Sequence, residues 1–276
     1  MRNFVIVGGT DGMGRALARH YVTTGDAVMV VGRNAAKGKG FLAEAGPDAR
    51  DRAHFVQADL STLAGQRTAA AQIARIFPVV DGLVFTAQRF HSTRMVTEDG
   101  YEATFALYYL ARKTLGDALV PLLEKAPQPV VVNVCGPGVK AGEMHWDDLQ
   151  LTQGYAGLKA MMQGSRANDL LGIGFTQEHP DSRISYVLYN PVFVATSFSG
   201  DYSKPVAVFI TIAKKLLATP VDKGVQPIIG LIDNPPAERI SAWKKRTRLP
   251  LDTPAFNPDD AARLRQITAD LLASHS

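Results

Sequence analysis

The chain has 276 residues, of which 46% are hydrophobic and 20% are charged, and its formal net charge is +4. A chain of this size can bury a substantial core, and it fits one α/β domain spanning residues 1–276 at least as well as two small ones. Its one dense basic cluster, residues 243–248, lacks the interleaved aromatic side chains and repeated spacing of a nucleic-acid surface. We therefore expect no nucleic-acid partner.

Cysteine usage and hydropathy indicate the cellular compartment in which the protein is expected. The single cysteine, Cys135, excludes an intrachain disulfide. No cationic segment followed by a long apolar run opens the chain. The longest apolar stretch, residues 105–123, is broken by Arg112, Lys113 and Asp117, whereas a bilayer span needs about 20 apolar residues. These features predict a cytoplasmic protein without membrane insertion.

Short β-branched runs alternate along the chain with longer segments of helical period, which is typical of a parallel sheet with crossover helices. The runs are almost continuously apolar, as strands buried on both faces should be. They occupy residues 3–7, 27–31, 54–57, 82–85, 130–134 and 184–189. After Pro191 the alternation ends, and we expect the following segment to fold over the sheet.

The first turn carries glycines at a spacing suited to a nucleotide. In "VGGTDGMGRALARHY", Gly8, Gly12 and Gly14 follow a strand and open a helix. Glycines there allow a tight turn and a close approach to a pyrophosphate, whose charge the helix N-terminus stabilises. Glycines can also be plain turn residues, but the strand–turn–helix context favours a nucleotide site. The predicted cofactor contacts in this turn are Gly8, Thr10, Asp11, Gly12, Met13 and Gly14.

The second strand ends in Gly32, Arg33 and Asn34, where an NAD enzyme would place a carboxylate against the ribose hydroxyls. A guanidinium can instead pair with a 2′-phosphate and stack on the adenine. Arg15 and Lys37 could add to the positive field. We therefore predict NADP(H), with Arg33 and Asn34 as contacts, although Arg33 could be an ordinary surface arginine.

The third strand is followed by "ADLS", residues 58–61. Asp59 could hydrogen-bond the adenine amino group, with Leu60 beside it. Asp59 could equally be the cap of the next helix.

Tyr155 and Lys159 in "YAGLK" are four residues apart, which would place them on one face of a helix. A phenol has a pKa near 10, so it transfers protons poorly at neutral pH unless a nearby cation stabilises its phenolate. The same spacing occurs by chance in many helices. After a glycine-rich NADP turn, it favours a catalytic pair.

Together these segments resemble the short-chain dehydrogenase/reductase family over nearly the whole chain. Two further segments, residues 145–150 and 223–235, are most similar to its retinol-dehydrogenase-like and protochlorophyllide-reductase-like branch. The resemblance implies a Rossmann fold, a doubly wound parallel sheet with helices on both faces. It also implies Tyr155 as proton donor and Lys159 as the residue that holds the ribose. Segment 190–198 is similar to the family's loop over the nicotinamide, and the implied further cofactor contacts are Thr86, Ala87, Pro191, Val194 and Thr196.

Three positions depart from the family pattern. Cys135 and Gly136 stand where the loop after the fifth strand normally carries a serine that hydrogen-bonds the substrate carbonyl. Tyr108 stands where an asparagine is usual, and residues 86–88 replace Asn-Ala-Gly. A replacement donor could be the Gly136 amide, the side chain of Thr86, Gln88, His145 or Cys135, or a hydroxyl of the substrate. For Cys135 itself, a packed small residue is the favoured interpretation.

These observations predict an NADPH-dependent reductase of a ketone or aldehyde on a fairly apolar small molecule. A catalytically idle NADP-binding sensor or regulator is the alternative, and an isomerase or dehydratase with bound cofactor is a third. The histidines do not group with acids at metal-ligand spacing, so we expect no metal. Residues 197–221 are expected to form a substrate lid. By resemblance, a homodimer or homotetramer would pair through helices near residues 101–123 and 152–171.

Overall fold

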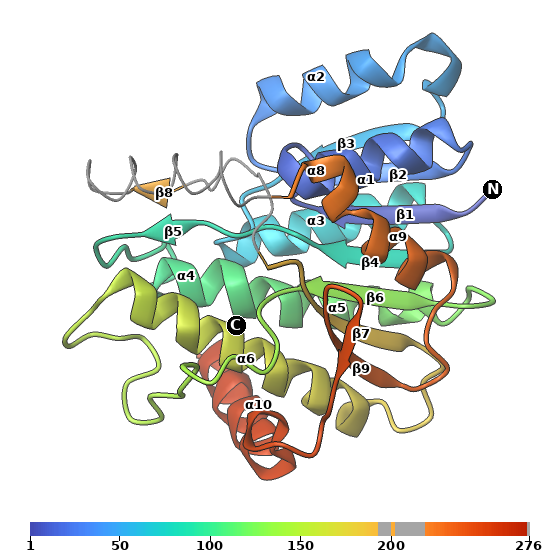
Figure 1. Cartoon of the computed structure of the whole chain (residues 1–276). Coiled ribbons are helices and arrows are strands. Elements are labelled where there is room, and N and C mark those ends of the chain that lie inside the picture. The colour runs from blue at the N-terminus through green and yellow to red at the C-terminus, as the bar shows by residue number, and fades with distance from the viewer. Residues whose placement is uncertain (193–199, 202–218, 275–276) are drawn as a thin grey trace.

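The computed structural model describes residues 1–192, 200–201 and 219–274 (Figure 1). Its main sheet has the strand order β10-β9-β7-β6-β4-β1-β2-β3, with only β10 antiparallel to its neighbour. The strands are β1 (Asn3–Val7), β2 (Ala27–Gly32), β3 (Ala53–Gln57), β4 (Gly82–Phe85), β6 (Val130–Val134), β7 (Ser185–Asn190), β9 (Ile240–Lys244) and β10 (Thr247–Leu249). The six predicted strands are confirmed to within one residue at each end.

The helices run between the strands. They are α1 (Gly12–Thr23), α2 (Ala35–Ala45), α3 (Leu63–Ile76), α4 (Ala103–Phe105), α5 (Ala111–Leu123), α6 (Gly157–Glu178), α8 (Val221–Gly224), α9 (Gln226–Asp233) and α10 (Pro258–Ala273). A π-helical turn, η2 (Ala106–Leu110), joins α4 to α5, and short 3-10 turns cover Pro47–Ala49 and Pro254–Phe256. Within the described residues, none of the helices is long and apolar enough to cross a bilayer.

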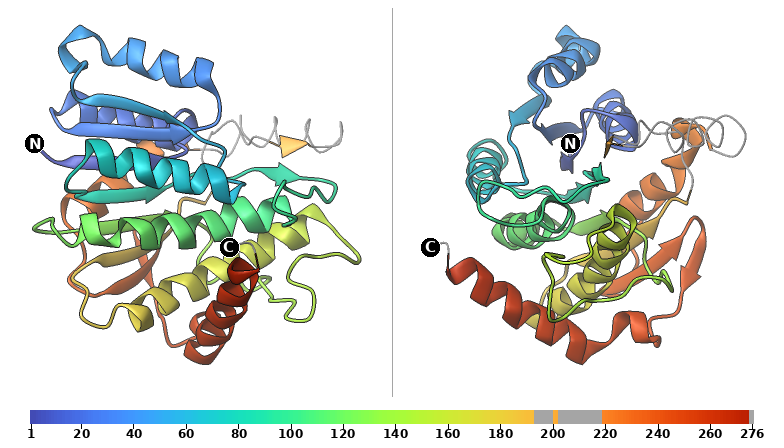
Figure 2. Two further views of the ribbon diagram at one scale, coloured as in Figure 1. Left: turned by 180° about the vertical axis from the view of Figure 1, so that it is seen from behind. Right: turned by 90° about the vertical axis from the view of Figure 1, so that its left-hand side faces the viewer.

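Alternate residues of the central strands point to two separate cores, one on each face of the sheet. Val5 and Leu83 pack with residues of α3, α5 and α6. Phe4 and Val84 pack with residues of α1, α2 and α9 on the other face. Figure 2 shows these helices on the two sides of the sheet. The predicted doubly wound Rossmann arrangement is therefore confirmed, and burial on both faces explains why its strands are apolar throughout.

The strand order reverses between β1 and β4, because β2 and β3 lie on one side of β1 while β4, β6 and β7 lie on the other. In open α/β sheets, ligands bind at the carboxyl ends of the strands at such a switch point. The carboxyl ends of β1, β4 and β6 meet at this switch point, and the candidate site lies there.

Helix α10 packs along α6 and reaches η2. The Tyr109 hydroxyl hydrogen-bonds the Thr268 hydroxyl at 2.8 Å, and the Tyr101 hydroxyl donates to Leu271 O at 2.9 Å. Ala261 of α10 is buried in the same core. The chain's own C-terminal helix thus covers part of the surface expected to form a dimer. The oligomeric state stays a prediction.

Most of the expected lid, residues 197–221, lies outside the described residues. Within it, Gly200–Asp201 forms β8, which pairs in parallel with β5 (Phe90–His91). The lid role stays a prediction.

Candidate functional site

The glycine turn between β1 and α1 lies at the switch point. Gly8 and Gly12 adopt left-handed φ angles of 86° and 51°, which glycine reaches without strain. A Cβ atom on Gly14 would lie 2.5 Å from both Gly8 O and Thr86 Oγ1. Asp11 is the N-cap of α1, and its carboxylate accepts a hydrogen bond from Gly12 N at 2.7 Å. The turn therefore presents bare backbone and the helix N-terminus, which fits a pyrophosphate.

The end of β4 closes the other side of this turn. A Cβ atom on Gly8 would lie 2.7 Å from Ala87 N, so the glycine turn and the end of β4 are too close for a side chain at position 8. The Thr86 hydroxyl donates to Val7 O at 2.8 Å. Because this bond uses the hydroxyl proton of Thr86, that side chain is poorly placed to replace the missing serine.

The end of β2 carries exposed cations. Arg33 is exposed and, among the described residues, has no carboxylate within ion-pair distance. Arg15 and Lys37 instead form ion pairs with Glu44 and Asp11, respectively. Of the three cations that the sequence placed near the 2′-phosphate, only Arg33 lacks an acidic partner.

The side chains of Asn34 and Asp59, two predicted cofactor contacts, form different hydrogen bonds. The Asn34 side chain caps α2 by accepting a hydrogen bond from Lys37 N at 2.9 Å. Asp59 accepts from the amide and hydroxyl of Ser61, at 2.9 and 2.7 Å, whereas Thr62 is the cap of α3. The alternative interpretation of Asp59 as a helix cap is therefore wrong, and its exposed carboxylate remains compatible with an adenine contact.

Tyr155 lies outside α6. The helix begins at Gly157 with Ala156 as its N-cap, so the expectation that Tyr155 and Lys159 share a helix face is wrong. The Tyr155 hydroxyl lies 3.1 Å from His91 O and 3.3 Å from Glu102 Oε1. Burial raises the pKa of this phenol, and the carboxylate of Glu102 adds to the rise. The phenol thus faces an acid rather than the expected lysine.

Helix α6 separates Tyr155 from the loop after β6. Gly157 packs directly on His91 O, whereas Ser165 packs on Gly136, where a Cβ atom would lie 3.2 Å from Ser165 Oγ. Eight helical residues span about 12 Å. The helix therefore separates Tyr155 from Cys135 and Gly136 by about this distance, and the catalytic role of Tyr155 and Lys159 stays a prediction.

A buried polar cluster that the sequence did not reveal lies behind that loop. The Arg112 guanidinium donates to Val134 O and Ala87 O, both at 3.0 Å, and to the Asn133 side chain. It also lies 4.4 Å from the ring centroid of Tyr108. The sequence marked Tyr108 only as a departure from the family, and it marked Arg112 only as a break in an apolar stretch.

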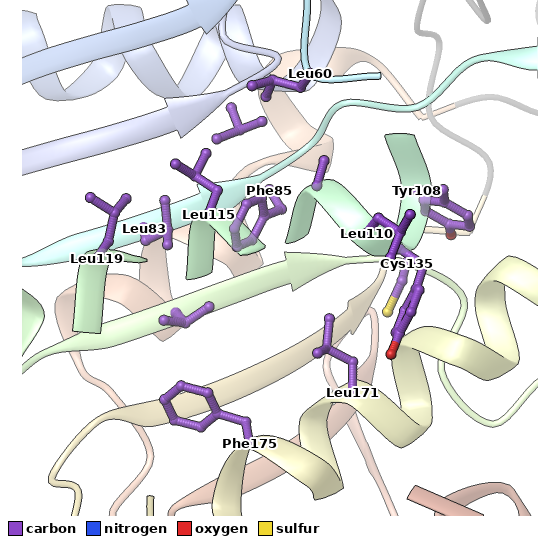
Figure 3. Packing of buried hydrophobic residues seen from close by; sticks show 14 of the residues in the cluster. Leu60, Leu83, Phe85, Tyr108, Leu110, Leu115, Leu119, Cys135, Leu171 and Phe175 are labelled. Atoms are coloured by element: carbon purple, nitrogen blue, oxygen red, sulfur yellow. The ribbon is translucent and has the colours of Figure 1, made fainter. Parts of the chain in front are cut away.

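Cys135 packs beside this cluster as a small buried residue, as predicted. It is 6% exposed, and burial raises the pKa of its thiol. Figure 3 shows Tyr108 and Cys135 at the same end of the packed hydrophobic cluster. A thiol in this environment is a weak donor and is not a reactive nucleophile.

The segment after β7 is described only at its start. Pro191 follows β7, and the Asn190 side chain accepts a hydrogen bond from Val192 N at 2.8 Å. The predicted contacts Val194 and Thr196 lie outside the described residues.

Comparison with known proteins gives a consistent family. The family model described as short chain dehydrogenase matches residues 2–165. Mouse retinol dehydrogenase 14 is 26% identical over 254 residues, covering 87% of this chain and 76% of that protein. Human polyprenol dehydrogenase is 27% identical over 168 residues, covering 59% and 51%, respectively.

Solved structures share the fold at low identity. A putative uncharacterized protein from Mycobacterium paratuberculosis has a TM-score of 0.75 at 19% identity, covering 98% of this chain and 93% of that one. A short chain dehydrogenase from Burkholderia cenocepacia in complex with NADP has a TM-score of 0.68 at 16% identity, covering 88% and 95%.

Proposed function

Because the chain belongs to the short-chain dehydrogenase family, we propose that this oxidoreductase uses NADPH to reduce a ketone or aldehyde on an apolar small molecule. The observation that carries the proposal is the turn of bare backbone at the switch point, with Arg33 at the adjacent strand end. When bound, the reduced nicotinamide supplies a hydride to the carbonyl carbon.

The residues of this chain fit such a cofactor. Gly8, Gly12 and Gly14 would hold the pyrophosphate, and the exposed Arg33 would pair with a 2′-phosphate. Asp59 would meet the adenine amino group. The end of β2 reads Gly32, Arg33, Asn34 and thus lacks the acid that would repel a 2′-phosphate, which supports NADP over NAD.

The apolar substrate class rests on the relatives. Retinol and polyprenol, named in two of them, are apolar alcohols whose oxidation products are carbonyl compounds. Proton delivery by Tyr155, which the family resemblance implies, would require that phenol to leave Glu102 and His91.

Arg33→Ala is expected to erase the preference for NADPH. In the wild type, NADPH should bind at least about tenfold more tightly than NADH, a difference of about 1.4 kcal/mol, because only NADPH carries the phosphate that a guanidinium can grip. Fluorescence titration of both cofactors measures the two affinities.

Arg50→Ala is the matched control. Arg50 is also an exposed arginine, but it precedes β3 and so lies near the amino ends of the strands, whereas Arg33 follows the carboxyl end of β2. The control should leave both affinities unchanged. Equal affinities of the wild type for NADPH and NADH would rule out this assignment.

A second candidate function is an idle NADP-binding protein. This candidate is favoured by the separation of Tyr155 from the loop after β6. NADPH absorbance in the presence of a panel of apolar aldehydes and ketones distinguishes the two. Consumption of NADPH supports the reductase, whereas tight binding without consumption of NADPH on every carbonyl supports the idle protein.

A further inference from the structure

The loop position that lacks the family's serine packs against another serine. A Cβ atom on Gly136 would lie 3.2 Å from Ser165 Oγ and 3.7 Å from Ser165 Cβ. Gly136 is not among the residues with left-handed φ, so its backbone would not strain a side chain, but the Cβ would be tight against Ser165 Oγ at 3.2 Å and Val139 Cγ2 at 3.3 Å. The hydroxyl of Ser165, carried by α6, therefore lies at the edge of the space that a side chain at position 136 would occupy.

Tyr108 lies directly behind Ser165. Its ring crosses α6 at Gly164, where a Cβ atom would come within 2.5 Å of Tyr108 Cδ1. Burial raises the pKa of the Tyr108 phenol to about 12, while the Ser165 hydroxyl beside it and the charge of Arg112 work against this rise. Tyr108 also lies in the π-helical turn η2, and such turns are frequent at functional sites.

Arg112 supplies a buried positive charge to this group. The residue is 2% exposed and, among the described residues, has no carboxylate within ion-pair distance. Burial lowers the pKa of Arg112. The acidic groups that oppose this shift are Tyr108, Cys135 and Tyr186, whose own pKa values are raised by burial. A buried cation without a counter-ion is costly and stabilises a neighbouring group that becomes negative.

We propose that Ser165 donates the hydrogen bond to the substrate oxygen that the loop after β6 lacks, and that Tyr108 beside Arg112 supplies the proton through it. The inference rests on the proposed reductase function. A bound NADPH would supply the hydride to the carbonyl carbon, while the carbonyl oxygen would take the Ser165 proton and Ser165 would take the Tyr108 proton. The alcohol and the oxidised cofactor would leave a tyrosinate beside the Arg112 charge, and a proton from water would restore the phenol.

Tyr155, Thr86 and Cys135 are less suited to donate this hydrogen bond. The Tyr155 phenol faces Glu102 and His91 O. The Thr86 hydroxyl donates to Val7 O, and the Cys135 thiol is a weak donor. Ser165 is the hydroxyl that lies against Gly136.

Moving the hydroxyl between the two positions tests the proposal. Ser165→Ala should lower kcat by about 100-fold and leave the NADPH affinity unchanged. Adding Gly136→Ser to Ser165→Ala should recover at least about tenfold, because it returns a hydroxyl to the same space. Gly136→Ser alone should bring no gain, since its side chain meets Ser165. Ser185→Ala is the control. Ser185 is also 5% exposed, but it is the first residue of β7 and so lies at the amino ends of the parallel strands, away from the candidate site.

Tyr108→Phe and Tyr155→Phe distinguish proton delivery by Tyr108 through Ser165 from proton delivery by Tyr155, which the sequence suggested. Tyr108→Phe should lower kcat by at least about 100-fold, whereas Tyr155→Phe should retain most of it. A large loss with Tyr155→Phe, together with full activity of Ser165→Ala, would overturn the inference. So would a folded Ser165→Ala, Gly136→Ser protein that recovers no turnover.

A measurement on the cofactor-free protein completes the test. Tyrosine labelled at Cζ with a heavy carbon isotope gives an NMR signal for each tyrosine of the chain. The signal that disappears in Tyr108→Phe belongs to Tyr108. Ser165→Ala should shift this signal, and the double variant should shift it back. An unmoved signal would overturn the Ser165–Tyr108 contact. A wild type that shows this contact yet consumes no NADPH would refute the reductase function instead.

Discussion

Gly14→Ala is expected to weaken NADPH binding by at least about 100-fold, or about 3 kcal/mol. The added Cβ would lie 2.5 Å from Gly8 O and from Thr86 Oγ1, and 2.9 Å from Gly8 C. Two of these three atoms are backbone, so no side-chain rotation relieves the overlap. The turn must open, and the amides that would face the pyrophosphate must move with it. Fluorescence titration with NADPH measures the loss.

Gly40→Ala is the matched control for this substitution. Gly40 lies inside α2, and a Cβ there would meet nothing within 4 Å. Alanine should leave NADPH affinity unchanged and raise stability by about 0.5 to 1 kcal/mol, because it favours a helix interior. Circular dichroism and a thermal melt establish that Gly14→Ala is folded. Wild-type NADPH affinity in a folded Gly14→Ala protein would show that the pyrophosphate binds elsewhere.

Much of the sheet could be predicted because its central strands leave a local signature. Strands β1, β2, β4 and β6 are buried on both faces, so hydrophobic residues follow one another without alternation. β9 and β10 were not predicted. They lie at the sheet edge and turn at Lys245, whose φ is 56°, and the exposed cations around that turn resemble a basic surface cluster.

The nucleotide turn could be predicted for the same local reason, since strand, glycines and helix are consecutive in the sequence. The position of Tyr155 relative to Lys159 could not be predicted in this way. A spacing of four residues places two side chains together only inside a helix, and the start of α6 depends on the packing of Gly157 against His91. The approach of Ser165 to Gly136 likewise depends on how α6 docks on the loop after β6, which no local pattern encodes.

Asp169→Asn is expected to remove a large loss of stability that accompanies a rise in pH from about 4 to about 8. Asp169 of α6 is 1% exposed, and its carboxyl accepts from Gly138 N at 3.1 Å, with Arg166 Nη1 at 3.7 Å. Burial raises its pKa to about 8, against the opposing effects of Gly138 and Arg166. Burial thus favours the protonated form of the carboxyl group that holds Gly138 in the loop after β6.

The sign of the effect follows from the direction of this shift. From about pH 4 to about pH 8, the unfolded chain has lost the Asp169 proton while the folded chain keeps it, so the free energy of unfolding falls as pH rises and levels off above about pH 8. The loss is at most about 6 kcal/mol. Asparagine has no proton to lose, and its oxygen can still accept from Gly138 N. Urea unfolding should therefore give similar stabilities for the two proteins near pH 4 and a clear advantage for Asp169→Asn near pH 9. Parallel pH profiles of the two proteins would mean that the Asp169 carboxyl ionises in the folded protein as readily as in the unfolded one.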